Sequence, residues 1–444
     1  MINIDNDFKA LTKKIKQQDC RITLVGSEDK LQVKETKYSF EGQLFKTIMK
    51  QINVSVPITD ITRQIKGKNL NFKYGLYLNN KFEYLDLGNF YVKDEPEDNK
   101  GSEQTEILAY DQLIHFMKIF KQSEMNLTYP CTMGIFVQRM CQVCNTDLYS
   151  TEFFFSDLVV EEDYFTAQEI TYRDVLEKVA QATLTTIIIK NNKLYLAPIL
   201  SNQVETLDRS YLSKLVITDK FGPVNALVLG RGDVEDNVEA IDQNSINING
   251  RCELRFDENE FLQYKREQVI DAMFKKIKGL TYYAFEASDI GIMWLEPVDC
   301  IGLKNNETDI YNSYYLEANI TINTGINSST QANIPEETET EYKVTSQEEK
   351  KYLKVERLAK KNEGQIQDLV EQNTEFENKM TQVEQDIDSI KQTVEDTVEY
   401  KREVSGITEI HLEDASNTEV TTLEIQGSKT YESNLYPRRK FISF

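Results

Sequence analysis

One run of residues towards the C-terminal end limits the possible folds of this chain more than any other feature. From Tyr352 to Thr397, mostly apolar side chains recur at alternating intervals of three and four residues, and Lys, Glu, Gln and Asp fill most positions between them. The recurring positions are Tyr352, Val355, Ala359, Asn362, Ile366, Leu369, Asn373, Phe376, Met380, Val383, Ile387, Ile390, Val394 and Thr397. This spacing, kept over about six heptads, is typical of a coiled coil. The sequence therefore predicts an oligomerisation rod at residues 352–398.

The same residues indicate how many helices share the rod. Ile387 and Ile390 place isoleucine at neighbouring a and d positions, which favours three or four strands over two, while Asn373 at an a position fixes the register at a cost in stability. A helix of this length extends roughly 70 Å at about 1.5 Å per residue. We therefore expect a trimer. The alternative is a single long helix that packs against its own chain.

The length and charge of the chain limit the remaining possibilities. Two to four domains are expected from 444 residues. With 51 basic and 73 acidic residues, the formal charge is −22, which disfavours a surface that grips the phosphates of a nucleic acid. We find neither an apolar run long enough to span a membrane nor a signal peptide at the start, so we expect synthesis in the cytoplasm without membrane insertion.

The residues before the rod predict a fold of the α+β class that is mainly β. Short alternating runs at 21–25, 52–56, 72–78 and 82–85 indicate antiparallel strands with a tight turn at 79–80, so residues 1–109 are predicted as a first β-barrel module. Residues 90–92 and 107–109 are expected to pair as a hairpin around an acidic loop.

An α+β insert is predicted at residues 110–214. Helical spacing occurs at 113–120 and 133–144, and Thr171 with Asp174 forms a candidate capping box for a third helix. Residues 185–190 and 193–198 flank an Asn-Asn pair and indicate a β-hairpin.

A second β-rich barrel module is predicted at residues 215–330. Its expected strands lie at 215–217, 226–229, 245–248, 282–287 and 315–323, and its expected helix at 261–278. An acidic linker at 331–351 leads to the rod, and a short β or tip segment is predicted at 399–444, with a strand or two between 407 and 425.

Residue patterns that carry chemistry are weak in this sequence. Cys141 and Cys144 form a CxxC on a predicted helix, but without a second pair or a nearby His they are best interpreted as buried thiols. The two histidines, His115 and His411, fall in different predicted modules, which disfavours a His-based catalytic pair. The six cysteines are thinly spread, which favours reduced thiols over a disulfide framework.

Acidic clusters at 161–163 and 235–236 could bind calcium or serve as acid and base, but 73 acidic residues produce such clusters by chance. An Arg-Gly-Asp at 231–233 is better explained as a turn after a strand. The sequence therefore predicts no catalytic, cofactor-binding or metal-binding residues, and a protein that is not an enzyme.

An ordered set of segments over residues 1–330 resembles the tail-tip or baseplate hub proteins of long-tailed bacteriophages, the family that includes the N-terminal region of tail-associated lysins and prophage endopeptidase tails. These segments are 87–92 (LGNFYV), 108–114 (LAYDQLI), 129–134 (YPCTMG), 170–176 (ITYRDVL) and 222–229 (GPVNALVL).

The resemblance implies a homotrimer in the virion tail tip, with two tube-like modules per chain in a pseudo-sixfold ring that joins the tail tube to a threefold tip. It also implies contacts with the distal tail protein, with other tail-tip or fibre proteins and with the tape measure protein, while DNA passes without specific binding. Longer family members carry a lysin, for which the residues after the rod leave too little room. A structural hub is thus the first hypothesis, a trimeric receptor-binding fibre or adhesin the second, and a cell-wall-degrading tail enzyme the third.

Overall fold

The fold is mainly β with several helices. The computed structural model describes residues 1–334 apart from 3, 14–16, 28, 99–102, 163, 166–169, 200–201, 231–236, 264 and 305–308, and then 409–413 and 419–424. The chain divides into two compact units, Met1–Ser346 and Gln347–Phe444.

The N-terminal part of the first unit consists almost entirely of strands. Its strands are β1 (Gln18–Leu24), β2 (Glu35–Glu41), β3 (Lys50–Pro57), β4 (Asn69–Leu78), β5 (Lys81–Tyr91), β6 (Glu97–Asp98) and β7 (Gln104–Tyr110), and its helices are α1 (Asn6–Thr12) and α2 (Asp60–Arg63). The tight turn between β4 and β5 is confirmed, since Asn79 and Asn80 have φ values of 52° and 64°. The strand β2 was not predicted.

β5 and β7 are antiparallel neighbours, as predicted for residues 90–92 and 107–109, but a single residue pair replaces the expected hairpin. β7 pairs with β3 over its whole length, from Gln51 opposite Tyr110 to Pro57 opposite Gln104, and it meets β5 only at Tyr91 and Tyr110. The alternating apolar residues of β7 complete the buried face next to β3, and burial of that face outweighs the proximity of β5 in sequence.

The next part combines helices with short strands, as predicted for the insert. Its elements are η1 (Gln112–Met117), α3 (Gln122–Met125), β8 (Cys131–Thr132), α4 (Met133–Val143), β9 (Asp147–Leu148), β10 (Val159–Val160), α5 (Tyr172–Ala182), β11 (Thr185–Lys190) and β12 (Lys193–Pro198). The capping box at the start of α5 is confirmed, with Thr171 and Asp174 each accepting from the other's backbone N–H. The first helical interval is a short 3₁₀ helix followed by α3, not one helix over 113–120.

A second β-rich part follows. Its elements are β13 (Glu205–Leu207), β14 (Leu212–Phe221), β15 (Ala226–Gly230), β16 (Val238–Ile241), α6 (Gln243–Asn249), β17 (Glu253–Asp257), α7 (Glu260–Gln263), α8 (Arg266–Ile277), β18 (Tyr282–Asp289), β19 (Cys300–Lys304), β20 (Ile310–Tyr314), β21 (Glu317–Ile322) and β22 (Ile326–Ala332). The strand predicted at 245–248 is wrong, because this segment is the helix α6. Asp242 caps that helix by accepting from the backbone N–H of Ser245, and this local hydrogen bond competes with the alternating pattern.

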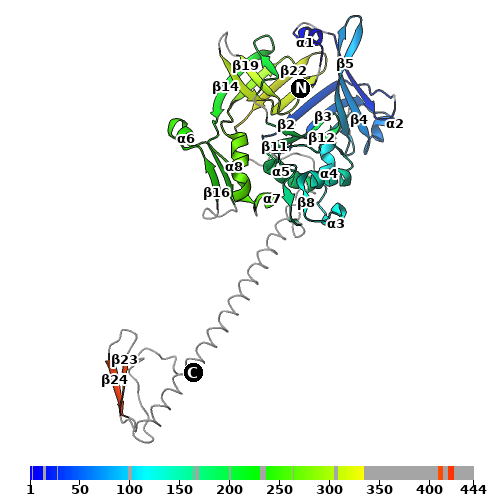
Figure 1. The fold of residues 1–444 in the computed structure, drawn as a ribbon. Coiled ribbons are helices and arrows are strands. Elements are labelled where there is room, and N and C mark those ends of the chain that lie inside the picture. Colours follow the sequence, from blue (N-terminus) through cyan, green and yellow to red (C-terminus); the bar gives the residue numbers. More distant parts are fainter. Residues whose placement is uncertain are drawn as a thin grey trace. The chain divides into compact units, whose positions relative to one another are not determined.

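One antiparallel sheet contains the seven strands of the first β-rich part and four strands of the second (Figure 1). Its strand order is β1-β4-β5-β7-β3-β2-β21-β22-β18-β14, with β6 attached to β7. The two parts meet at β2 and β21, which pair from Thr36 opposite Ile322 to Glu41 opposite Glu317. Among the described strands no barrel closes, so the two separate barrels predicted from the sequence are not observed. The predicted domain boundaries stay a prediction.

The first half of this sheet curls around its own core. The buried ring of Tyr38 on β2 lies 6.2 Å from Phe72 on β4 and 6.4 Å from Phe90 on β5, measured between ring centroids. Such aromatic contacts add to the hydrophobic burial that holds the curl. The remaining strands of the unit form small sheets, with the orders β10-β8, β11-β12-β9, β13-β19-β20 and β16-β15-β17.

In the second unit, β23 (Glu409–Glu413) and β24 (Glu419–Glu424) pair as an antiparallel hairpin, which confirms the strands expected between 407 and 425. The acidic linker from residue 335 onwards, the predicted rod at 352–398 and the rest of the C-terminal segment lie outside the described residues.

Candidate functional site

One face of the large sheet is polar over both β-rich parts. On β3, Ile52, Val54 and Val56 are fully buried, while the alternating residues Gln51, Asn53 and Ser55 are only partly covered. The strand β21 repeats this pattern, with buried Ala318, Ile320 and Ile322 between partly or fully exposed polar residues. Because successive side chains of a strand point to opposite faces, the polar residues share one face of the sheet.

Cross-strand registers show that this face continues without a break across β2 and β21. Lys37 on β2 lies opposite Asn53 on β3 and also opposite Thr321 on β21. The same row extends to Leu108 on β7 at one end and Asn327 on β22 at the other. We refer to the outward residues of β7, β3, β2, β21, β22, β18 and β14 as the polar face.

Hydrogen bonds within the polar face join neighbouring strands. The amide of Gln51 donates to the hydroxyl of Ser39 at 3.0 Å, and the amide of Asn53 donates to the carboxylate of Glu106 at 3.0 Å. Ser55 donates to the side-chain oxygen of Gln104 at 3.0 Å. These contacts satisfy the side chains locally, so they offer few free donors to a passing molecule.

A row of carboxylates crosses the polar face. Glu41 lies opposite Glu317, Glu317 opposite Gln331, and Gln331 opposite Glu286. Burial raises the pKa of Glu317 above its ordinary value, and the carboxylates of Glu41 and Glu286 raise it further, while donors from Gln331 and Asn319 act in the opposite direction. This row places three carboxylates on the face, at the end of β2, at the start of β21 and within β18.

The polar face also has a shallow depression of about 210 Å³ where β3, β2 and β21 meet. Its polar lining consists of Lys37, Ser39, Gln51, Asn53, Asn319 and Thr321. The ammonium group of Lys37 is 3.5 Å from the carboxylate of Glu35, which offsets its charge. Amide and hydroxyl groups therefore dominate the depression.

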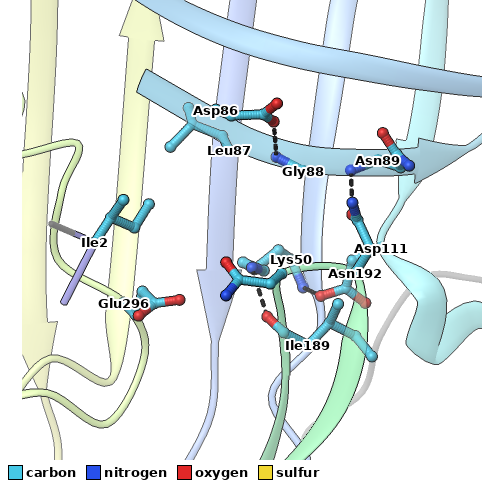
Figure 2. A pocket seen from close by; sticks show the side chains of 11 residues that line it. Ile2, Lys50, Asp86, Leu87, Gly88, Asn89, Asp111, Ile189, Asn192 and Glu296 are labelled. Carbon is cyan, nitrogen blue, oxygen red and sulfur yellow. Dashed lines mark hydrogen bonds between the residues drawn. The ribbon is translucent and has the colours of Figure 1, made fainter. Parts of the chain in front are cut away.

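A second cavity, of about 240 Å³, lies behind the sheet where β3, β5 and the β11–β12 hairpin meet (Figure 2). Lys50, Asp111 and Glu296 line it and are 7%, 1% and 6% exposed, so three charged side chains are almost completely buried there. Asn192, at the hairpin turn, points its side-chain oxygen at the backbone N–H of Asn89, 2.7 Å away.

The charged groups of this cavity already have partners in the protein. Asp111 accepts from the backbone N–H groups of Lys50 at 2.9 Å and Leu113 at 3.0 Å, and the ammonium group of Lys50 donates to the carbonyl of Ile189 at 2.8 Å. Burial raises the pKa of Asp111 to about 6, although Lys50 opposes this shift.

The negative charge of Glu296 also has partners within the protein. Its carboxylate lies 3.0 Å from the ammonium group of Lys190 and 3.1 Å from the amino group of Met1. Burial opposes ionisation of Glu296, but Met1, Lys190 and Lys50 together hold its pKa below the ordinary value. The cavity is therefore a structural joint between the sheet and the insert, in which protein groups satisfy the polar atoms of Lys50, Asp111 and Glu296.

The residues considered for chemistry do not converge on a site. His115 accepts or donates a hydrogen bond with Gln112 at 3.2 Å and packs on the ring of Tyr91, and burial lowers its pKa. Cys141 and Cys144 are buried free thiols whose pKa burial raises, which matches the interpretation from sequence. Residue 163 of the first acidic cluster lies outside the described residues. So do residues 231–236, which include the second acidic cluster and the Arg-Gly-Asp, and the side chain of His411.

Within the described part of the chain, no group of three or more His, Cys, Asp or Glu residues could hold a metal ion. In the same part, no helix has both the length and the apolar character that crossing a membrane requires. The oligomerisation residues from Tyr352 to Thr397 all lie outside it.

Sequence reasoning missed the polar face. Its signal was present in the alternation of Asn, Gln, Ser and Thr with apolar residues at 51–56 and 317–332. Only the registers, however, place those segments side by side.

No protein-family model matches this chain, and no curated protein matches it. Solved structures do. The chain is similar to a tail protein from Neisseria meningitidis, with 8% identity and a TM-score of 0.44 over 71% of this chain and 95% of that one. It is similar to the 43 kDa tail protein of prophage MuSo2 from Shewanella oneidensis, with 9% identity and a TM-score of 0.44 over 71% and 97%.

A Francisella PdpA-VgrG complex is a third similar structure, with 10% identity and a TM-score of 0.43 over 76% of this chain and 63% of that chain. The predicted resemblance to phage tail and baseplate proteins is thus confirmed as a structural similarity.

Proposed function

We propose that this chain is a structural hub of a phage tail tip, in which three copies form a ring and the polar face lines the channel through which DNA leaves. The observation that carries this proposal is the unbroken polar face across β2 and β21. In this proposal, both β-rich parts of each copy contribute to the wall, as a pseudo-sixfold ring of three copies requires.

The chemistry of the polar face suits a channel for DNA. Amide and hydroxyl side chains that already bond to one another, such as Gln51 with Ser39, have few free donors for phosphate. The row from Glu41 to Glu286 repels phosphate, and Lys37 is offset by Glu35. DNA therefore passes along this wall without sticking to it.

The proposal includes the parts of the chain beyond the first unit. The rod at 352–398 holds three copies on the threefold axis, and residues 399–444 form a short tip. The distal tail protein, other tail-tip or fibre proteins and the tape measure protein are the proposed partners, and the virion tail tip is the proposed location.

Reversal of the wall charge tests this proposal. Particles that carry Glu317→Lys with Glu286→Lys are expected to release DNA about tenfold more slowly, because six added cations per trimer contact phosphates in the channel. The matched control is Glu152→Lys with Asp157→Lys, two exposed residues of the insert that give the same change in net charge.

The assay is DNA release from purified particles, and electron microscopy checks that both variants assemble. Equal release rates for the two variants, with intact tails, would show that the polar face is not the channel wall.

The alternatives make different predictions. A receptor-binding fibre would sit at the periphery of the tail, whereas the hub requires three copies on the tail axis. A cell-wall enzyme would release fragments from peptidoglycan, and purified protein is expected to release none.

A further inference from the structure

The large sheet has an open edge at β14, which lies at the margin of the second β-rich part (Figure 1). Apart from its pairing with β18, residues 213–221 make no backbone hydrogen bond within the described part of the chain. No residue between Leu212 and Phe221 is buried. Unpaired backbone groups at such an edge promote pairing with a further strand. Two register shifts limit the regular part of β14 to residues 214–217, and this window is where a strand can add.

The core side of this window lacks cover. Leu215 and Ile217 lie opposite Ala287 and Phe285, which are 5% and 1% exposed. Their own side chains are only partly buried, because nothing in the described residues pairs with β14 on its outer side. A strand that fits here therefore carries apolar or β-branched residues on its core side.

The other side of the window belongs to the polar face. Lys214 and Val216 lie opposite Ser288 and Glu286, and Val216 is 40% exposed. Lys214 is exposed and makes no ion pair with any described residue. A strand that fits here therefore carries acidic residues on its polar side, where a carboxylate opposite Lys214 is favourable.

The chain leaves the sheet close to this edge. The strand β22 ends at Ala332, which shares a row with Phe285 and Ile217. Both β22 and β14 are antiparallel to β18, so a segment that turns back after β22 runs antiparallel to β14. Pro335 favours such a break in the strand. Residues 333–337 span up to about 17 Å, and three strand spacings from β22 to a position beyond β14 require about 14 Å.

Residues 338–344, with the sequence TETEYKV, have the alternation that the edge requires. One side of a strand formed by them carries Thr338, Thr340, Tyr342 and Val344, which are β-branched or aromatic. The other side carries Glu339, Glu341 and Lys343. The first set suits Leu215 and Ile217, and the second places two carboxylates on the side of Lys214.

We propose that residues 338–344 add to the large sheet as a further strand, antiparallel to β14 of the same chain. Tyr342 and its neighbours of even number cover the core side, while Glu339 and Glu341 extend the polar face by one strand. The inference does not rest on the proposed hub, because it depends only on the open edge and on the sequence that follows β22.

Disulfide cross-linking of the full-length protein tests the pairing through its period of two residues. Val216→Cys is combined in turn with a cysteine at each of five positions, Glu339, Thr340, Glu341, Tyr342 and Lys343. Since Val216 lies on the polar side, oxidation at the best odd position is expected to be at least about tenfold faster than at either even position. The link should lie within one chain, as shown by a monomer band without reductant and by mass spectrometry of the joined peptides.

The two even positions are the matched controls, because they lie in the same segment and differ only in the side to which they point. The wild type, whose six cysteines are free thiols, and the Val216→Cys single variant are expected to form no such link.

Hydrogen exchange provides a measurement without cysteine. Tyr342→Asp places a charge against Leu215 and Ile217, so exchange in residues 214–217 is expected to become about tenfold faster. Lys343→Gln changes the net charge by the same amount on the polar side and should leave that exchange unchanged.

The possible outcomes are distinct. Links at odd positions between different chains would overturn the assignment to the same chain, because they place the segment of one copy on β14 of another. Equal linking at odd and even positions, no linking at any position, or unchanged exchange in Tyr342→Asp would overturn the strand addition. None of these results alters the test of the hub, which measures DNA release in variants of Glu317 and Glu286.

Discussion

Replacement of Asp111 by Asn tests how burial controls the ionisation of the Asp111 carboxyl group in the cavity behind the sheet. Asp111 is 1% exposed, and burial raises its pKa from 3.8 to about 6. A carboxyl group whose pKa is higher in the folded than in the unfolded state binds its proton more tightly in the folded state. Its contribution to stability is therefore complete below pH 3.8 and is lost as the pH rises through about 6.

The size of the effect follows from the shift. A change of about two pKa units at 1.36 kcal/mol per unit corresponds to about 3 kcal/mol, distributed over this pH window. The introduced asparagine cannot ionise and keeps one oxygen to accept from Leu113, so the variant loses about 1 kcal/mol from one hydrogen bond at every pH. As the pH rises from 4.5 to 7, the stability of the Asp111→Asn variant relative to wild type should therefore increase by about 2 kcal/mol.

Thermal unfolding of the full-length chain at several pH values measures this difference, with the signal taken from the large unit. Asp157→Asn, at an exposed carboxylate of the insert, is the control for the loss of one carboxylate at the surface. A constant difference between the Asp111→Asn variant and wild type from pH 4.5 to pH 7 would refute the reasoning, because Asp111 would then ionise equally easily in the folded and unfolded states.

Three further predictions concern other parts of the chain. Thr171→Ala removes the acceptor that caps α5 together with Asp174, and it should lower the free energy of unfolding by about 1–2 kcal/mol and speed hydrogen exchange in the first turn of that helix. Glu317→Gln should raise the melting temperature more at pH 7 than at pH 4, since burial and neighbouring carboxylates raise the pKa of Glu317; an equal change at both pH values would contradict this. Ile387→Asp with Ile390→Asp should dissociate the predicted rod by burying charge in its seam, and an unchanged mass in sedimentation would show that the seam is not an interface.

Local signals in the sequence predicted several elements correctly. The capping box at Thr171 and the Asn-Asn turns at 79–80 and 191–192 were identified because capping and turn formation depend on residues within a few positions. The helix α6 was missed because a local capping signal was given less weight than an alternating pattern. Its alternating Ile246 and Ile248 suggested a strand, yet Ile248 is 81% exposed and the cap at Asp242 decides the local structure.

The heptad spacing, the acidic balance and the alternation of polar with apolar residues are properties of the sequence by itself, because each depends on the order of residues alone. The partners of the strands depend on the tertiary structure. β7 is closer to β5 than to β3 in the chain but pairs mainly with β3, and β2 pairs with β21, which lies about 280 positions further on. Pairing between such distant segments depends on which buried faces match, and a period of two residues is the same in every strand. The polar face, and with it the proposed channel wall, therefore exists only in the folded sheet.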